Sequence, residues 1–131
     1  MIIKDVMNNT IYSIKSNEKV REAIRLLQEY NINRLFVVND NDSIIGSIGY
    51  IDLFEIIKPA EKLNIDDISV SELMDVNINF IDVNEVVENA ANLILRSETS
   101  ALIVTEDNKN VGVITKTDIC RCVAMSKLIG K

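Results

Sequence analysis

The feature that most constrains this chain is an internal repeat, in which one pattern of apolar residues occurs twice. Four apolar residues with the i, i+3, i+4, i+7 spacing of one helix face recur 67 positions later. They are Val20, Ala23, Ile24 and Leu27 in the first copy, and Val87, Ala90, Ala91 and Ile94 in the second. A half of about 60 residues buries too little surface to be stable by itself, so the two copies are expected to pack together.

The helix belongs to a larger repeated unit. A glycine and an aspartate also recur, since Gly46 and Asp52 match Gly112 and Asp118, 66 positions later. Each copy shows a short alternating strand, an amphipathic helix, two apolar strands and a second helix. The predicted fold class is therefore α/β (α+β), with two β-α-β-β-α repeats related by pseudo-twofold symmetry and packed into one module.

The boundaries of the repeats follow from helix-breaking and polar residues. The repeats are predicted to span 1–62 and 63–131. A polar linker is predicted over about 59–70, because Pro59 stops the helix that is expected over 52–58.

The change of offset from 67 to 66 requires a one-residue deletion in the second copy. Placed between the first helix and the strand that follows it, the deletion aligns Leu35–Val38 with Ala101–Val104. This alignment makes Ser100 the counterpart of Arg34.

Composition and charge narrow the class of protein. Of the 131 residues, 47% are apolar, which is enough for a folded core, and no apolar run is long enough to span a bilayer. The net charge is −6, and the 14 basic residues form no cluster, so nucleic acid is not an expected partner. The first residues, Met1 to Asp5, lack the pattern of a signal peptide, so the expected location is the cytoplasm, with no membrane partner.

The residue types that usually carry catalysis or bind metals are scarce. The chain has no histidine, which removes the commonest general base and the commonest metal ligand. Cys120 and Cys122 lie two positions apart on an expected helix, where they face different directions, so neither a disulfide nor a structural zinc site is predicted. No nucleophile elbow or phosphate loop occurs. We therefore expect no enzymatic activity, no metal and no required cofactor.

The stretch from Gly112 to Asp118 is the best candidate for a site. It joins an apolar strand to a helix, and it places Thr115 and Asp118 three residues apart on the turn. This spacing is that of a capping box, in which the two side chains satisfy backbone N–H groups. The same groups can also hold the ribose and phosphate of a nucleotide at a helix start. Spacing alone favours the cap.

The tandem pattern resembles a pair of cystathionine β-synthase (CBS) domains, the assembly called a Bateman module. The resemblance covers nearly the whole chain and depends on five stretches, of which two are the turns of form Gly-x-x-x-x-x-Asp. The others are Val6-Met7, Asn33-Arg34-Leu35-Phe36-Val37-Val38 and Thr99-Ser100-Ala101-Leu102-Ile103-Val104.

The resemblance implies two ligand clefts between the halves, and it assigns residues to each. In the first, Asp118 binds ribose hydroxyls and Thr115 reaches the ribose or phosphate, with Thr117 nearby. Val113 contacts the base, Arg34 and Asn33 supply the phosphate end, and Tyr12 lies in the strand whose backbone contacts adenine.

The second implied cleft pairs Asp52 with Ser100 and departs from the family pattern. Gly49 replaces the usual Ser or Thr, and Ser100 replaces the basic residue. A lost hydrogen bond to a charged group weakens binding by about 1.5–3 kcal/mol, so this site is predicted to be weak or empty. From the residues alone, Asp52 is a helix N-cap and Arg34 a solvated strand end.

By this resemblance, the predicted function is a regulatory sensor of AMP, ADP or ATP that changes the packing of its two repeats when the nucleotide binds. An adenine nucleotide is then its regulatory ligand, a homodimer its expected assembly, and a regulated protein a further possible partner. Two alternatives stay open: a non-sensing dimerisation or interaction module, and a binder of S-adenosylmethionine or NAD.

Overall fold

The computed structural model describes residues 1–54 and 64–128 of the chain, with the side chains of 126–128 left aside. The chain forms two compact units. We call residues Tyr12–Asn77 the central unit, and residues Met1–Ile11 with Ile78–Lys131 the terminal unit, after their places in the sequence.

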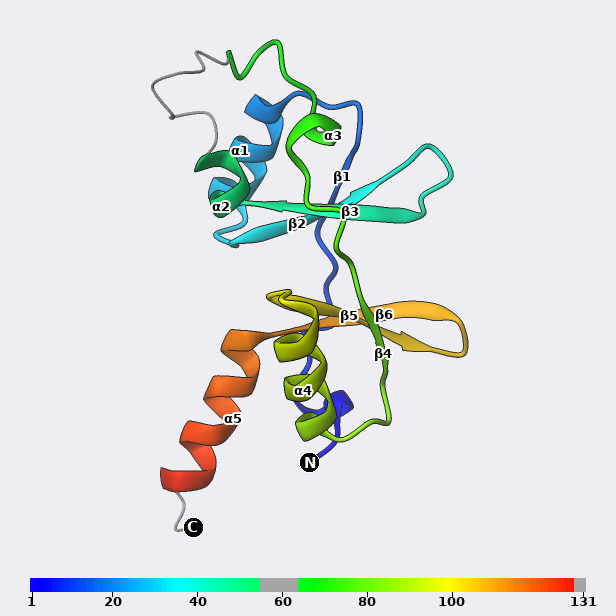
Figure 1. The fold of residues 1–131 in the computed structure, drawn as a ribbon, viewed down its shortest axis with the longest axis vertical. Helices are drawn as coiled ribbons and strands as arrows, with labels where there is room; N and C mark the ends of the chain where they lie inside the picture. The colour runs from blue at the N-terminus through cyan, green and yellow to red at the C-terminus, as the bar shows by residue number, and fades with distance from the viewer. Residues whose placement is uncertain (55–63, 129–131) are drawn as a thin grey trace. The chain divides into compact units, whose positions relative to one another are not determined.

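The central unit is a three-stranded sheet covered by helices (Figure 1). In chain order it consists of β1 (Ser13–Lys15), α1 (Val20–Glu29), β2 (Arg34–Val38), β3 (Ile44–Gly49), α2 (Tyr50–Leu53) and α3 (Val70–Leu73). The sheet order is β1-β2-β3, with β1 parallel and β3 antiparallel to β2. Because the connection between the parallel strands is α1, the amphipathic helix predicted from Val20 onward covers the sheet.

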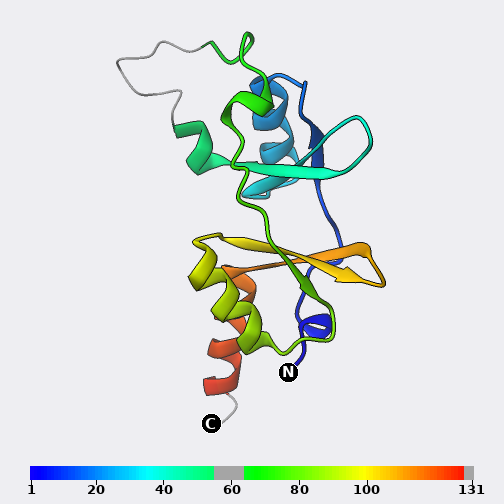
Figure 2. The ribbon, with the colours of Figure 1, turned by 45° about the vertical axis from the view of Figure 1, so that its right-hand side comes forward.

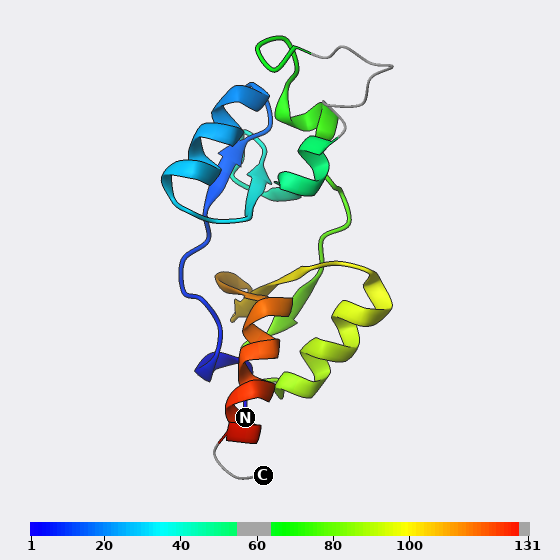
Figure 3. The same cartoon turned by 90° about the vertical axis from the view of Figure 1, so that its left-hand side faces the viewer.

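The terminal unit repeats this arrangement, as Figure 2 shows. It consists of η1 (Ile3–Asp5), β4 (Phe80–Asp82), α4 (Val87–Ser97), β5 (Ala101–Glu106), β6 (Lys109–Thr115) and α5 (Lys116–Leu128). Its sheet order is β4-β5-β6, again with one parallel and one antiparallel pair. Helices α4 and α5 lie side by side in all three views (Figure 3). The predicted mixed α and β fold with two repeats is therefore confirmed.

Each unit has its own apolar core, made by the repeated helix face and the two apolar strands. The central core includes Ile14, Val20, Ala23, Leu27, Leu35, Val37 and Ile48. The terminal core includes Ile3, Ile81, Val83, Ala90, Ile94, Leu102, Val104 and Ile114. No helix in the described ranges is long and apolar enough to cross a membrane.

In each unit, a short segment from the start of one predicted repeat packs on the sheet of the other repeat. Residues 1–11 belong to the terminal unit, and the residues up to Asn77 belong to the central unit. In the terminal unit, Asn8 and Val113 exchange two backbone hydrogen bonds of 2.8 and 2.9 Å. In the central unit, Asp75 and Ser47 do the same, at 2.7 and 2.9 Å. The compact units therefore combine stretches that are far apart in the chain.

The repeated glycine leaves room for this segment. A Cβ atom on Gly112 would lie 2.6 Å from the carbonyl oxygen of Asn8 and 2.9 Å from Sδ of Met7. A Cβ atom on Gly46 would likewise lie 2.8 Å from the carbonyl oxygen of Asp75. Both distances are far below ordinary contact, so the glycine and the methionine-containing segment of each unit are matched by packing.

The strand register corrects the alignment of the two repeats. Phe36 pairs with Ser13 and Ser47, and Ile103 holds the same place between Phe80 and Val113. The offset of 67 therefore continues through β2 and β5, and the deletion lies in the hairpin that follows.

Arg34 is consequently the counterpart of Ala101, and the predicted match with Ser100 is wrong by one residue. Apolar runs resemble one another in either alignment, whereas the hydrogen-bond ladder allows only one.

One of the expected helices begins earlier than the sequence indicates. Helix α2 begins at Tyr50, where 52 was expected, and the rest of the predicted helix over 55–58 lies outside the described residues, as does Pro59. Helix α5 begins at Lys116, directly after β6, as a cap at Thr115 requires.

Candidate functional site

The turn between β6 and α5 forms the predicted capping box. The backbone N–H and the hydroxyl of Thr115 each donate to Oδ2 of Asp118 at 2.9 Å, and the Asp118 N–H donates to the Thr115 hydroxyl at 3.1 Å. Both side chains are half-buried. The arrangement satisfies the first free N–H groups of α5 and places a carboxylate at its positive end.

The cap leaves binding capacity on this turn. Oδ1 of Asp118 has no hydrogen-bond partner among residues 1–54 and 64–128, so it can accept from a ligand hydroxyl. The proton of the Thr115 hydroxyl, in contrast, is already donated to Asp118. Capping and ligand binding are therefore compatible for Asp118.

The other predicted residues of the terminal unit lie around this turn with different exposure. Thr117 is exposed on the first turn of α5, and Val113 is only 8% exposed in β6. Ser100 is half-buried before β5, and its carbonyl oxygen accepts from the N–H of Lys116 at 3.0 Å. Ser100 thus contacts the start of α5 through its backbone.

The equivalent turn of the central unit, between β3 and α2, lies beside an arginine. Arg34 stands at the start of β2, and its Nη1 donates to the hydroxyl of Ser47 at 2.7 Å and to Oδ2 of Asp52 at 3.5 Å. The same Asp52 oxygen accepts from the N–H of Gly49 at 2.8 Å. Gly49 is the N-cap of α2 and Asp52 is its third residue, so the expectation that Asp52 is itself the N-cap is wrong. Arg34 is therefore bound within its own unit and is not a freely solvated strand end.

Burial and neighbouring charges set the state of Asp52. Burial is the largest influence and raises the pKa of this carboxyl above its ordinary value. The Gly49 N–H and the Arg34 guanidinium lower the pKa, and the nearby Asp75 raises it again. The net direction is upward, so the arginine only partly offsets the cost of burying the carboxylate.

In the cross-strand pair beside each turn, the larger residue lies on the first strand in the central unit and on the second strand in the terminal unit. Arg34 faces Gly49 in the central unit, and Ala101 faces Thr115 in the terminal unit. A Cβ atom on Gly49 would lie 2.6 Å from the carbonyl oxygen of Asn33 and 3.3 Å from Nη2 of Arg34. Position 49 therefore has no room for the side chain of its counterpart Thr115, because the Asn33 carbonyl oxygen and the Arg34 guanidinium occupy that space.

The remaining predicted residues of the central unit are Asn33 and Tyr12. Asn33 is exposed directly before β2. Tyr12 is half-buried and packs on Tyr30, with ring centroids 4.8 Å apart, and its carbonyl oxygen accepts from the N–H of Phe36 at 2.9 Å.

The structure groups the predicted residues by unit. Arg34, Asn33, Asp52 and Tyr12 belong to the central unit; Asp118, Thr115, Thr117, Val113 and Ser100 belong to the terminal unit. The predicted groupings of Arg34 with Asp118, and of Asp52 with Ser100, each join residues of different units and stay predictions.

One residue that contacts Arg34 was not predicted from the sequence. Ser47 is 5% exposed in β3, and its hydroxyl binds Arg34. Its signal is a single polar side chain inside the apolar run from Ile44 to Ile48. A buried hydroxyl needs a partner, and this rule points to Arg34 on the adjoining strand.

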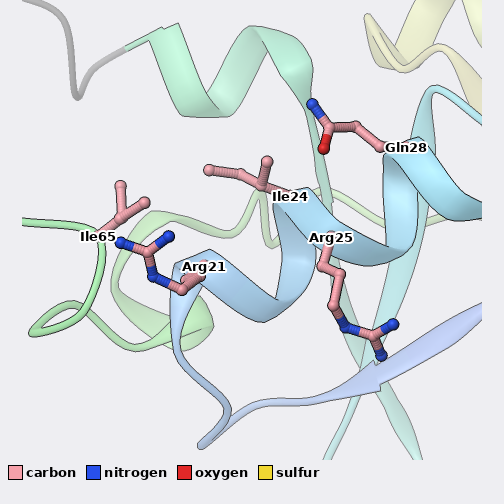
Figure 4. A pocket seen from close by; sticks show the side chains of 5 residues that line it. All are labelled: Arg21, Ile24, Arg25, Gln28 and Ile65. Atoms are coloured by element: carbon pink, nitrogen blue, oxygen red, sulfur yellow. The ribbon is translucent and has the colours of Figure 1, made fainter.

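A groove of about 280 Å³ lies elsewhere on the central unit (Figure 4). Its lining residues are Arg21, Ile24, Arg25, Gln28 and Ile65. Arg21 pairs with Asp66, and Arg25 with Glu22 and Glu29, so neither guanidinium offers an unbalanced positive charge. The groove therefore lacks the charge that an anionic ligand requires.

The part of the chain that the structure describes holds no candidate metal site. No cluster of three or more Cys, Asp or Glu side chains with metal-binding geometry occurs there. Cys120 and Cys122 are both free thiols.

Comparison with known proteins identifies the family. The fold and its paired turns define a tandem α and β repeat module, and the CBS domain model matches residues 3–59 and 70–125. The chain belongs to the CBS domain family, as the resemblance predicted.

Individual relatives support the same assignment. L-Aspartate semialdehyde sulfurtransferase from Methanosarcina acetivorans is 33% identical over 94% of this chain. The chain spans 24% of the length of this sulfurtransferase, and 39% of the length of another curated relative, from Methanocaldococcus jannaschii, that is 31% identical.

Two solved structures match at 25% identity. The CBS domain pair of MJ0100, in complex with 5′-methylthioadenosine and S-adenosyl-L-methionine, has a TM-score of 0.79, covering 94% of this chain and 99% of that one. CBSX2 in complex with AMP has a TM-score of 0.75, covering 96% and 98%.

Proposed function

We propose that this chain is a regulatory module that binds an adenine nucleotide. The observation that carries the proposal is the half-buried Asp118 carboxylate, which caps α5 with one oxygen and keeps the other free of partners among the described residues. The complexes of MJ0100 and CBSX2, which hold adenosine compounds, support this ligand class.

The proposal gives each candidate residue a role. Asp118 accepts from ribose hydroxyls, as acidic residues do in other nucleotide-binding folds. Arg34 donates to phosphate, and Thr115 orients Asp118 through the capping box. Thr117, Val113, Asn33 and Tyr12 complete the predicted site, while Asp52 and Ser100 form the weaker one.

The response to the ligand is the second part of the proposal. Ligand binding favours one packing of the two repeats and so passes a signal to a protein partner or to a homodimer. An enzymatic activity is not proposed for this chain, and the sulfurtransferase name belongs to a relative four times as long as the match. A cytoplasmic location stays a prediction.

The experiment is a thermal-shift titration with AMP, ADP, ATP, NAD and S-adenosylmethionine, repeated with Asp118→Ala. At 100 times the dissociation constant, a ligand stabilises the folded state by about 2.7 kcal/mol. We expect a shift with an adenine nucleotide that Asp118→Ala abolishes.

The matched control is Glu72→Ala. Glu72 caps α3 by accepting from the Ser69 N–H at 2.7 Å, so its loss removes a capping carboxylate outside the proposed site. This variant should keep the full ligand-induced shift. No shift of the unmodified protein with any of these ligands would refute the proposal and favour the non-sensing interaction module.

A further inference from the structure

Arg34 is held at one end and open at the other. Its Nη1 donates to Ser47 and Asp52, whereas Nε and Nη2 have no hydrogen-bond or ion-pair partner among residues 1–54 and 64–128. The side chain as a whole is 21% exposed, so it is not sealed in the core. Two parallel N–H donors on one edge of a guanidinium match an oxyanion such as phosphate.

Three neighbours set the position of the guanidinium. The Ser47 bond, at 2.7 Å, is the shorter of the two, and Asp52 adds a charge partner at 3.5 Å. Gly49 leaves the space that Nη2 occupies, since even a methyl group there would lie 3.3 Å from this nitrogen. An anchored arginine loses less side-chain freedom on binding than a mobile one does.

The terminal unit keeps the aspartate, as Asp118, and lacks the other parts. Its residues at the corresponding positions are Ala101, Val113 and Thr115, in place of Arg34, Ser47 and Gly49. The anchored cation is therefore a property of the central unit.

We propose that Ser47 is a positioning residue that, with Asp52 and Gly49, holds Arg34 as a two-donor receptor for a phosphate group. The inference rests on the proposed function and deepens it: the module distinguishes phosphorylated adenosine ligands from unphosphorylated ones through the Ser47–Arg34 bond.

Isothermal titration with AMP and with adenosine tests this inference. Ser47→Ala should weaken AMP binding about tenfold, which corresponds to about 1.4 kcal/mol, and leave adenosine binding unchanged. Arg34→Lys, which keeps the charge but loses the fork, should weaken AMP binding to a similar extent. Ser43→Ala, at an exposed serine of the hairpin between β2 and β3, is the matched control and should change neither affinity.

A nuclear magnetic resonance measurement reads the anchoring without any nucleotide. The Nη signals of Arg34 should be separately resolved in the unmodified protein, because the Ser47 bond hinders rotation of the guanidinium, and they should merge in Ser47→Ala. Inorganic phosphate should shift the Nε–H signal only at concentrations well above those of AMP, which separates a nucleotide site from a site for the free ion.

The outcomes distinguish the two proposals. If none of AMP, ADP, ATP, NAD and S-adenosylmethionine binds the unmodified protein, the proposed function fails, and the Arg34 signals still report on the positioning role. An unchanged ratio of AMP to adenosine affinity in Ser47→Ala, or Nη signals that stay resolved in that variant, would overturn the inference. A gain of a second AMP site in Arg34→Ala would also overturn it, since Arg34 would then be blocking the Asp52 turn.

Discussion

Replacing Arg34 with alanine should destabilise the central unit by an amount that depends on pH. The change removes a charge-assisted hydrogen bond to Ser47 and the charged partner of Asp52. The Arg34 side chain is 21% exposed, and the Asp52 side chain is 16% exposed. A hydrogen bond to a charged group contributes about 1.5–3 kcal/mol, so we expect a loss of about 2 kcal/mol at pH 7. For a chain of this size, that corresponds to a fall in melting temperature of roughly 8 °C.

The sign of the pH dependence follows from Asp52. Burial already raises the pKa of its carboxyl, and Arg34 is one of the groups that lower it, so Arg34→Ala should raise this pKa further. A carboxyl whose pKa is raised on folding favours the folded state when protonated, and the benefit is lost as pH rises through the raised pKa. The variant should therefore lose less stability at about pH 4, near the ordinary pKa of an aspartate, than at pH 7.

The assay is urea unfolding followed by circular dichroism between about pH 4 and pH 8. Asp52→Asn added to Arg34→Ala should remove the extra pH dependence, because the neutral amide cannot ionise. Arg25→Ala is the matched control, since this exposed arginine pairs with Glu22 and should change stability by less than about 1 kcal/mol. A loss in Arg34→Ala that is the same at every pH would refute the role assigned to Asp52.

Two further predictions concern the terminal unit. Gly112→Ala should destabilise it by about 1–3 kcal/mol, because the added methyl group would lie 2.6 Å from the Asn8 carbonyl oxygen. Urea unfolding measures this loss. A neutral effect would mean that the Asn8 segment moves freely. Thr115→Ala should cost about 1 kcal/mol through loss of the cap of α5. Faster amide exchange in the first turn of α5 would report that loss, and unchanged exchange would count against the cap.

The repeat, the fold class and the turn at Asp118 could all be predicted from the sequence. These depend on local patterns: a 3.6-residue period in the helix from Val20 or Val87, apolar runs in the strands, and a capping pair three residues apart at Thr115 and Asp118. Local patterns of this kind survive in the folded chain because the same side chains that specify a helix or strand also form its buried face. The structure confirms these features.

The tertiary structure alone decided which partners these elements take. The exchange of the Asn8 and Asp75 segments between units depends on pairing with β6 and β3, at sequence distances that no local pattern encodes. The register that equates Arg34 with Ala101 depends on a hydrogen-bond ladder, and apolar runs do not distinguish a one-residue shift. The Arg34–Ser47 bond follows from that register, because it forms only when β2 and β3 bring the two side chains together.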